Sequence, residues 1–149
     1  ETVQMKISKI RDVKDPVRAN NDDAGIDFFI PNDSKKITIY PNEGAIIPSG
    51  IKVNVPSGHA LIAFNKSGIA TKKGLQVGAC VVDCGYQGEI HIHLTNTGIG
   101  TQTLHAGDKI VQFVLVQLGS PDVEVVEEQF LYNAVSNRGT GGFGSTGTK

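Results

Sequence analysis

Asp83 is the residue of this sequence best placed to act as a general base, because it stands between an apolar segment and a tight turn. The apolar run 77–82 leads into this carboxylate, and the turn that follows contains Gly85, Tyr86 and Gly88. A carboxylate at the mouth of a hairpin, with an aromatic ring three residues on, is able to hold a water molecule beside a ring-shaped ligand. The alternative is structural, since aspartate at a turn often accepts hydrogen bonds from backbone amides. The hairpin alone leaves both interpretations open.

A second candidate group is formed by Lys66, Ser67 and Gly68, which precede a short predicted helix over 67–73. Ser67 is suited to the N-cap of this helix and Gly74 to its C-cap. Free backbone N–H groups, a hydroxyl and an ammonium then lie together, which favours binding of an anion. An ordinary capped helix without a ligand is the alternative.

Two polar residues interrupt otherwise apolar strands. Asp27 lies within the apolar segment 24–31, where an unpartnered carboxylate is costly. It is either open to water at a sheet edge or held for a cation, directly or through water. Gln112 lies within the apolar segment 107–115, where its amide needs hydrogen-bond partners. It is either satisfied by neighbouring backbone or reaches into a site.

The C-terminal segment 137–147 is rich in glycine and hydroxyl residues, which predicts disorder until a ligand orders it. Its backbone N–H groups are suited to phosphate oxygens, Arg138 to a terminal phosphate, and Phe143 to the face of a base. It lacks the Gly-Lys-Ser/Thr of a Walker loop. A flexible C-terminus without a ligand remains the alternative.

The two cysteines, Cys80 and Cys84, are too close for an unstrained disulfide across a strand. His91 and His93 follow, but they are only two residues apart, so the usual zinc spacings are not both met. We therefore expect free thiols and no zinc. Free thiols are typical of a reducing compartment, and we expect a soluble, cytoplasmic protein.

The length of 149 residues predicts one domain, and the net charge of −1 gives no general attraction to polyanions. We therefore expect no direct binding of nucleic acid. No apolar run approaches the roughly 20 residues that span a bilayer, so we expect no membrane partner.

Helical periodicity is almost absent, and glycine and proline mark frequent turns. Many short strands with this punctuation predict an all-β sandwich or jelly roll with one short helix. The predicted strands cover residues 3–10, 24–31, 36–40, 44–48, 51–55, 59–64, 90–95, 101–106, 107–115 and 123–126.

Five stretches, in the same order, together resemble the trimeric deoxyuridine triphosphatases, or dUTP nucleotidohydrolases. They are 24–27, 66–70, 77–89, 107–112 and 138–147, of which the third and the fifth are the most specific. The resemblance implies a jelly-roll (distorted β-barrel) catalytic domain over 1–131. It also implies a flexible C-terminal arm over 132–149 that closes over a neighbouring subunit's active site in a homotrimer.

The resemblance further implies hydrolysis of dUTP to dUMP and pyrophosphate, which keeps uracil out of DNA and supplies dUMP for thymidylate synthesis. Asp83 matches the carboxylate that activates the water attacking the α-phosphorus, and Tyr86 the ring against the deoxyribose. Mg2+ is expected to arrive with the triphosphate, with Asp27 linked to it through water only. The other substrate-binding positions implied are Lys66, Ser67, Gly68, Cys80, Val81, His91, Gln112, Arg138, Phe143, Gly144, Ser145 and Thr146.

Within this set, the backbone at Cys80 and His91 falls where the family reads the uracil edge. Three positions depart from the family pattern. Lys66 stands where arginine is usual, which gives a point charge in place of a two-pronged donor. Cys80 replaces a usual glycine, and Gly85 stands where a second acid is common.

Two other functions compete with this interpretation. A dCTP deaminase-like enzyme needs a further carboxylate on the strand that leaves the hairpin, but residues 91–94 read His-Ile-His-Leu. A dUTP-sensing module that regulates a protein partner needs no turnover, and the intact Asp83 and Arg138 argue against a catalytically dead sensor.

Overall fold

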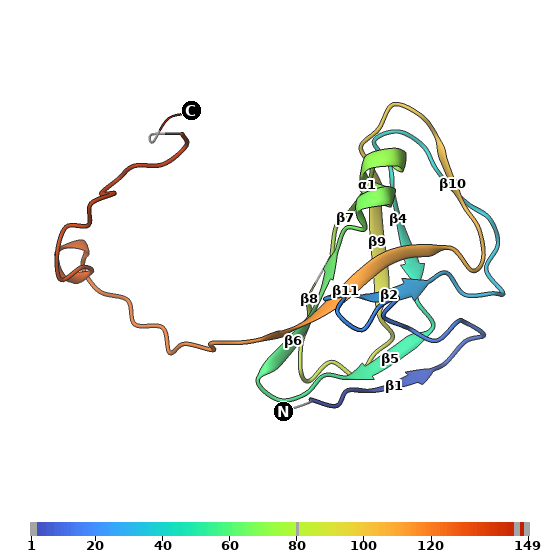
Figure 1. The fold of residues 1–149 in the computed structure, drawn as a ribbon, viewed down its shortest axis with the longest axis horizontal. Coiled ribbons are helices and arrows are strands. Elements are labelled where there is room, and N and C mark those ends of the chain that lie inside the picture. The colour runs from blue at the N-terminus through green and yellow to red at the C-terminus, as the bar shows by residue number, and fades with distance from the viewer. Residues whose placement is uncertain (1–2, 80, 145–146, 148–149) are drawn as a thin grey trace. The chain divides into compact units, whose positions relative to one another are not determined.

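A computed structural model of the chain describes residues 3–79, 81–144 and 147. The chain divides into two compact units, Glu1–Gly119 and Ser120–Lys149. The first unit holds all the strands formed by the described residues (Figure 1). Among the helices of the described residues, none is long and apolar enough to cross a membrane.

The first unit is built from short antiparallel strands and one α-helix, which confirms the all-β prediction. The strands are β1 (Lys6–Lys9), β2 (Ile26–Phe29), β3 (Ile37–Ile39), β4 (Gly44–Pro48), β5 (Ile51–Asn54), β6 (His59–Phe64), β7 (Leu75–Val77), β8 (Val81–Val82), β9 (His91–Asn96), β10 (Gln102–Leu104) and β11 (Lys109–Gln117). The helix α1 (Ser67–Lys73) connects β6 to β7.

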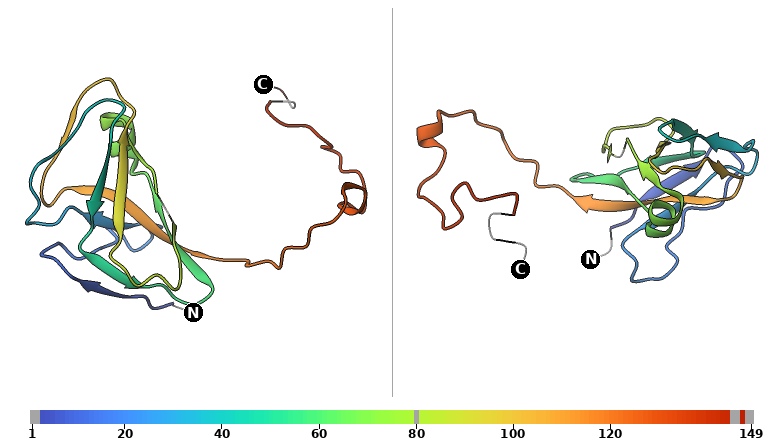
Figure 2. Two further views of the ribbon diagram at one scale, coloured as in Figure 1. Left: turned by 180° about the vertical axis from the view of Figure 1, so that it is seen from behind. Right: turned by 90° about the horizontal axis from the view of Figure 1, so that it is seen from above.

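The largest sheet has the strand order β2-β11-β6-β8, and a three-stranded sheet has the order β4-β9-β7. Two further pairs, β1-β5 and β10-β3, complete the strand pairing of the described residues, in which no closed barrel forms. The views from opposite sides agree that β4 and β9 run steeply across β2 and β11 (Figures 1 and 2).

Side chains from these strands form one apolar core. Phe28 and Phe113, from adjacent strands β2 and β11, have ring centroids 4.5 Å apart. The register of β2 and β11 shifts between Lys109 and Val111, an irregularity of the β-bulge type. A bulge places an extra residue on one side of the ladder, which accounts for the burial of both Ile110 and Val111.

Strand β9 follows the predicted alternation. Ile92 and Leu94 are buried, whereas His91 is exposed and His93 is half-buried. Because successive side chains of a strand point to opposite faces, this pattern places the aliphatic residues in the core and the histidines outside it.

The helix has the predicted bounds and the predicted C-cap, since Gly74 adopts a left-handed φ of 67°. The predicted N-cap is wrong. Lys66 is the N-cap, with extended backbone angles and no side-chain capping bond, while Ser67 already belongs to the helix. The physical reason is that the carbonyl of Lys66 already accepts the first helical hydrogen bond, from the N–H of Ala70 at 2.9 Å.

The second unit contains a short 3-10 helix, Glu128–Phe130, and otherwise irregular backbone. The strand predicted over 123–126 does not form. Valine-rich sequence favours a strand, but a strand needs a ladder partner for its backbone groups, and the described residues provide none for this segment.

Candidate active site

The hairpin of the antiparallel strands β7 and β9, which contains β8 in its long connection, carries the residues predicted to perform chemistry. Strand β8 pairs with β6, with Leu61 opposite Val82, and ends one residue before Asp83. The backbone N–H of Tyr86 donates to the carbonyl of Asp83 at 3.1 Å and closes the turn. The apolar run therefore anchors the hairpin in the large sheet and leaves Asp83 at its rim.

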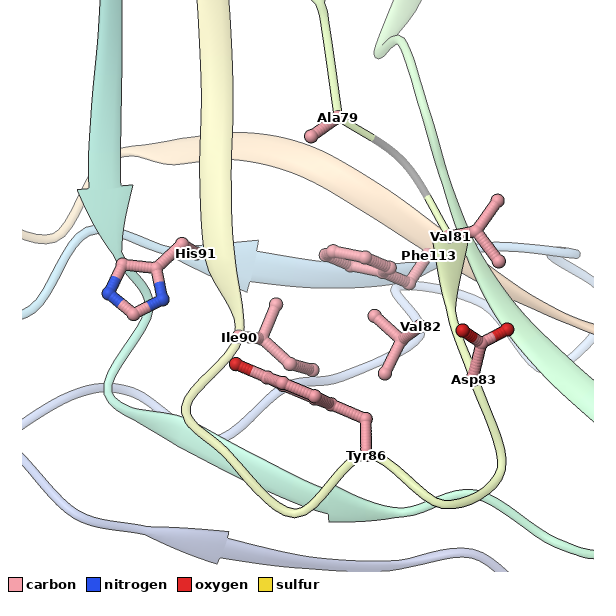
Figure 3. Close-up of a pocket in the computed structure, with 8 residues that line it drawn as sticks. All are labelled: Ala79, Val81, Val82, Asp83, Tyr86, Ile90, His91 and Phe113. Carbon is pink, nitrogen blue, oxygen red and sulfur yellow. The ribbon is translucent and has the colours of Figure 1, made fainter.

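A pocket of about 210 Å³ lies inside this hairpin (Figure 3). Asp83 and Tyr86 line it together with apolar side chains, whereas the ring of His91 is turned away from the other labelled side chains. The lining residues are Ala79, Val81, Val82, Asp83, Tyr86, Ile90, His91 and Phe113.

The side chain of Asp83 is exposed, and in residues 3–79, 81–144 and 147 no hydrogen bond to its carboxylate is formed. A capping role at the turn requires a backbone amide to donate to that carboxylate. The geometry therefore favours a carboxylate that is free to accept a proton from water over one that stabilises the turn.

Tyr86 is held in place by its own hairpin. Its hydroxyl donates to the carbonyl oxygen of Glu89 at 2.8 Å. Its ring also lies over Gly88, where an added Cβ would stand 2.5 Å from the tyrosine Oη. The absence of a side chain at position 88 is thus a condition for this position of the ring.

Glu89 has a dense set of partners that sequence reasoning did not find. Arg11 donates from Nε at 2.7 Å and from a second nitrogen at 3.1 Å, and the backbone N–H of Gly50 donates at 2.9 Å. These hydrogen bonds, the guanidinium above all, lower the pKa of Glu89 below its usual value of 4.5. The Glu89 carboxylate in turn raises the pKa of Arg11. Because Arg11 and Glu89 are 78 residues apart, no local pattern signals the pair.

A second hollow, of about 280 Å³, gathers residues predicted to bind phosphate. Lys66, Ser67 and Gln112 line it together with Asp27 and Lys109. The hollow lies beside the start of α1 and the strands β2 and β11, and its lining is mainly polar.

Asp27 is the buried acid of this hollow, with only 3% of its surface exposed. Lys66 Nζ lies 2.6 Å from one carboxylate oxygen, and Lys109 Nζ lies 3.4 Å from the other. Strand β2 does lie at the edge of its sheet, but Asp27 is not open to water there, and its buried charge is compensated by two ammonium groups. A metal-linked role for Asp27 stays a prediction.

Gln112 is half-buried and donates to the backbone carbonyl of Asn65 at 2.9 Å. Its amide oxygen lies so close to Gly25 that a Cβ at that position would collide with it. Gln112 is thus positioned by neighbouring backbone and also lines the polar hollow, so the two interpretations are compatible. Gly68, in the first turn of α1, faces open space.

The two hollows are separate in one chain. On β6, Leu61 pairs with Val82 of the hairpin, and Phe64 pairs with Gln112 of the polar hollow. Three residues along a strand correspond to about 10 Å. Asp83 and the phosphate-binding candidates are therefore not gathered in one pocket of a single chain.

The remaining predicted positions belong to the second unit or lie outside the described residues. Within the second unit, Arg138 Nε donates to the Gly141 carbonyl. Phe143 is fully exposed with a positive φ of 49°, and Gly144 has a φ of 86°. The predictions for Cys80, Ser145 and Thr146 fall on residues that are not described.

No group of three or more His, Cys, Asp or Glu side chains gathers as a set of metal ligands within the described part of the chain.

Hydrolysis of a phosphate compound needs a group that orients or deprotonates water and positive groups near the phosphates, and the Asp83 pocket and the Lys66 hollow contain groups of these kinds. The sequence model described as dUTPase matches residues 11–147. This chain therefore belongs to the dUTPase family.

Curated relatives and solved structures agree with this assignment. The deoxyuridine 5'-triphosphate nucleotidohydrolase of Mus musculus is 39% identical over 132 residues, which cover 89% of this chain and 77% of that protein. The protein of the same name from Clostridium tetani is 37% identical over 148 residues, covering 98% and 97%. The structure of the Staphylococcus bacteriophage 80alpha dUTPase with dUpNHpp has a TM-score of 0.85 and 25% identity, covering 98% of this chain and 99% of that chain.

Proposed function

We propose that this chain hydrolyses dUTP to dUMP and pyrophosphate, with Asp83 activating the water that attacks the α-phosphorus. The observation that carries the proposal is the exposed Asp83 carboxylate, which receives no hydrogen bond from the described residues and shares a pocket with Tyr86. In the cell, this reaction keeps uracil out of DNA and supplies dUMP for thymidylate synthesis.

Hydrolysis of a phosphate ester is slow because the anionic centre repels nucleophiles and the leaving group carries charge. A site needs a positioned water, a base and positive groups around the phosphates. Asp83 serves as the base, which typically contributes about 10² to 10⁴-fold. Lys66, Ser67, Gly68 and Gln112 provide an ammonium, a hydroxyl, backbone and amide groups for phosphate oxygens.

Mg2+ fits this site as an ion carried by the nucleotide. The described residues offer no cluster of protein ligands, and both oxygens of Asp27 already contact lysines. When bound, the ion neutralises charge on the triphosphate. Asp27 would act on it only through water, and its direct contacts place Lys66 beside the phosphates.

Base and sugar selection are assigned to the hairpin. Tyr86 packs against the deoxyribose and leaves no room for a 2′-hydroxyl, and Val81 lines the same pocket. The backbone at Cys80 and His91 reads the uracil edge. The ring of His91, which points away from the pocket, supports a role for its backbone alone (Figure 3). A mismatched buried polar group costs roughly 1–3 kcal/mol, which disfavours cytosine.

A homotrimer completes the site. A single chain keeps the Asp83 pocket and the Lys66 hollow apart, so a neighbouring copy is needed to bring one of each kind together. A threefold ring is a closed arrangement that repeats such a site three times.

The catalytic domain covers 1–131, and the flexible arm 132–149 closes over a neighbour's site. There Arg138 contacts the γ-phosphate, Phe143 stacks on uracil, and Gly144, Ser145 and Thr146 contact phosphates.

The proposed compartment is the cytoplasm. Cys84 is a free, exposed cysteine, which supports a reducing, cytoplasmic environment for the protein.

Release of pyrophosphate from dUTP, dCTP, dTTP and UTP with Mg2+ tests the proposal. We expect steady-state turnover of dUTP and little of the other three. Ammonia from dCTP would indicate a deaminase instead, and tight dUTP binding without turnover would indicate a sensing module. Either result would reject the proposal.

A further inference from the structure

The hairpin residue Glu89 connects the sugar-facing tyrosine to the N-terminal segment of the chain. The carboxylate of Glu89 receives two hydrogen bonds from Arg11 and one from the backbone N–H of Gly50. Only 11% of the Glu89 side chain is exposed. A two-pronged guanidinium–carboxylate contact fixes orientation as well as distance.

The backbone of the same residue holds Tyr86. The tyrosine hydroxyl donates to the Glu89 carbonyl at 2.8 Å. The N–H of the same peptide unit, that of Ile90, donates to the carbonyl of Ile51 at 2.9 Å. The peptide unit on which Tyr86 rests is thus attached to β5, while the Glu89 side chain is attached to Arg11 and Gly50.

We propose that Arg11 and Glu89 are positioning residues for sugar selection, because together they fix the peptide unit that holds the Tyr86 ring against the deoxyribose. This inference rests on the proposed function. Neither residue lines the Asp83 pocket. Arg11 acts on Glu89, Glu89 acts on Tyr86, and Gly88 leaves the space into which the ring folds.

Replacement of Arg11 tests whether its contact with Glu89 affects sugar selection. Arg11→Met removes both hydrogen bonds to Glu89, and Lys9→Met removes a comparable surface pair, Lys9–Asp15, with a separation of 2.8 Å. We expect the ratio of kcat/KM for dUTP to kcat/KM for UTP to fall roughly tenfold to hundredfold in Arg11→Met, in the range of a misplaced binding group. Lys9→Met should keep the wild-type ratio.

The ratio separates positioning from general destabilisation. A partly unfolded enzyme loses kcat/KM for dUTP and kcat/KM for UTP in the same proportion, so their ratio stays constant. Arg11→Lys keeps the charge but not the two-pronged geometry, and we expect it to restore the ratio only in part. Full restoration by lysine, or an unchanged ratio in Arg11→Met, would overturn the proposal.

A matched pair of glycine variants tests the position of the ring without touching the ion pair. In Gly88→Ala the new Cβ would meet the Tyr86 hydroxyl, whereas at Gly85, in the same turn, a Cβ meets nothing within 4 Å. We expect Gly88→Ala to lower the dUTP/UTP ratio and Gly85→Ala to leave it unchanged. Equal behaviour of the two variants would contradict the role given to the ring.

Fluorine NMR provides a readout that is independent of activity. The chain has three tyrosines, so 3-fluorotyrosine labelling gives three signals, and the Tyr86 signal is assigned with Tyr86→Phe. We expect Arg11→Met to shift or broaden the Tyr86 signal alone. If the wild-type protein fails to hydrolyse dUTP, the proposed function is rejected, and this spectrum still tests whether Arg11 and Glu89 position Tyr86. If dUTP is hydrolysed but the Tyr86 signal is unchanged in Arg11→Met, the positioning role is rejected and the proposed function is not.

Discussion

Two acids of one hairpin have opposite surroundings. Asp83 is exposed and receives no hydrogen bond from the described residues, whereas Glu89 is bound by a guanidinium and a backbone amide. A free carboxylate is available to a water molecule, and a carboxylate whose oxygens are occupied is not. Asp83 is therefore suited to chemistry, and Glu89 to holding the structure around it.

Asp83→Asn tests this division at the catalytic position. The amide keeps the shape of the side chain but cannot take a proton from water, so turnover should fall by about 10² to 10⁴-fold. Binding of dUTP, measured by calorimetry, should remain close to that of the wild type. Asp122→Asn, at an exposed position of the second unit, is the control. Substantial residual hydrolysis in Asp83→Asn would remove this residue from the role of base.

Glu89→Gln tests the structural acid through the pH dependence of stability. The pKa of Glu89 is lowered in the folded protein, first by its hydrogen bond with Arg11. A lowered pKa means that its contribution to stability is present above the usual value of 4.5 and is lost as the pH falls through the lower, folded value.

The difference in free energy of unfolding between wild type and Glu89→Gln should therefore be largest near neutral pH. It should shrink as the pH drops below about 4.5, because protonated glutamate resembles glutamine in charge. Urea denaturation at a series of pH values measures it. A difference that stays constant down to the lowest pH would show that the ionised form of Glu89 contributes nothing.

At the scale of elements, Asn96 joins strands that lie far apart in the sequence. It is fully buried in β9, donates to the carbonyls of Ile39 and Gly100, and accepts from the N–H of Gly98. One side chain thus satisfies three backbone groups around the loop after β9. A buried group left without a partner costs about 1–3 kcal/mol.

Asn96→Ala should accordingly lower the free energy of unfolding by about 2–4 kcal/mol. Asn54→Ala, at an exposed position at the end of β5, should change it by less than about 0.5 kcal/mol. Urea denaturation of both variants measures the free energy of unfolding. Equal stability of the two proteins would contradict the role assigned to Asn96.

The predictions of strands and of the helix were confirmed where the local sequence pattern determines the structure. Alternation and turn residues located β4, β6 and α1 to the residue. The N-cap at Ser67 failed because the helical hydrogen bonds begin one residue earlier, at the carbonyl of Lys66. The strand over 123–126 failed because propensity alone does not supply a pairing strand.

The candidate site shows the same limit. Asp83 and Tyr86 were predictable because they lie three positions apart in one turn. The partners of Glu89 and the second lysine on Asp27 come from other strands and loops, so only folding brings them together. The sequence around these residues shows their charges but not which residues they pair with.

At the scale of the whole molecule, the second unit is expected to contribute to catalysis but not to folding. The first unit contains the whole buried apolar cluster, whereas residues 137–149 supply the proposed Arg138 and Phe143 contacts. Deletion of 137–149 should therefore leave a folded trimer with little dUTP turnover. Sedimentation velocity and pyrophosphate release measure the two properties. Full activity in the truncated protein would exclude the arm from the reaction.

The central claim is that water activated by Asp83 attacks the α-phosphorus of dUTP. Hydrolysis in H2¹⁸O, followed by mass spectrometry of both products, tests it most directly, because the attacked phosphorus keeps the oxygen from water. We predict that the label appears in dUMP and not in pyrophosphate. Label in pyrophosphate would show attack at the β-phosphorus and contradict the mechanism.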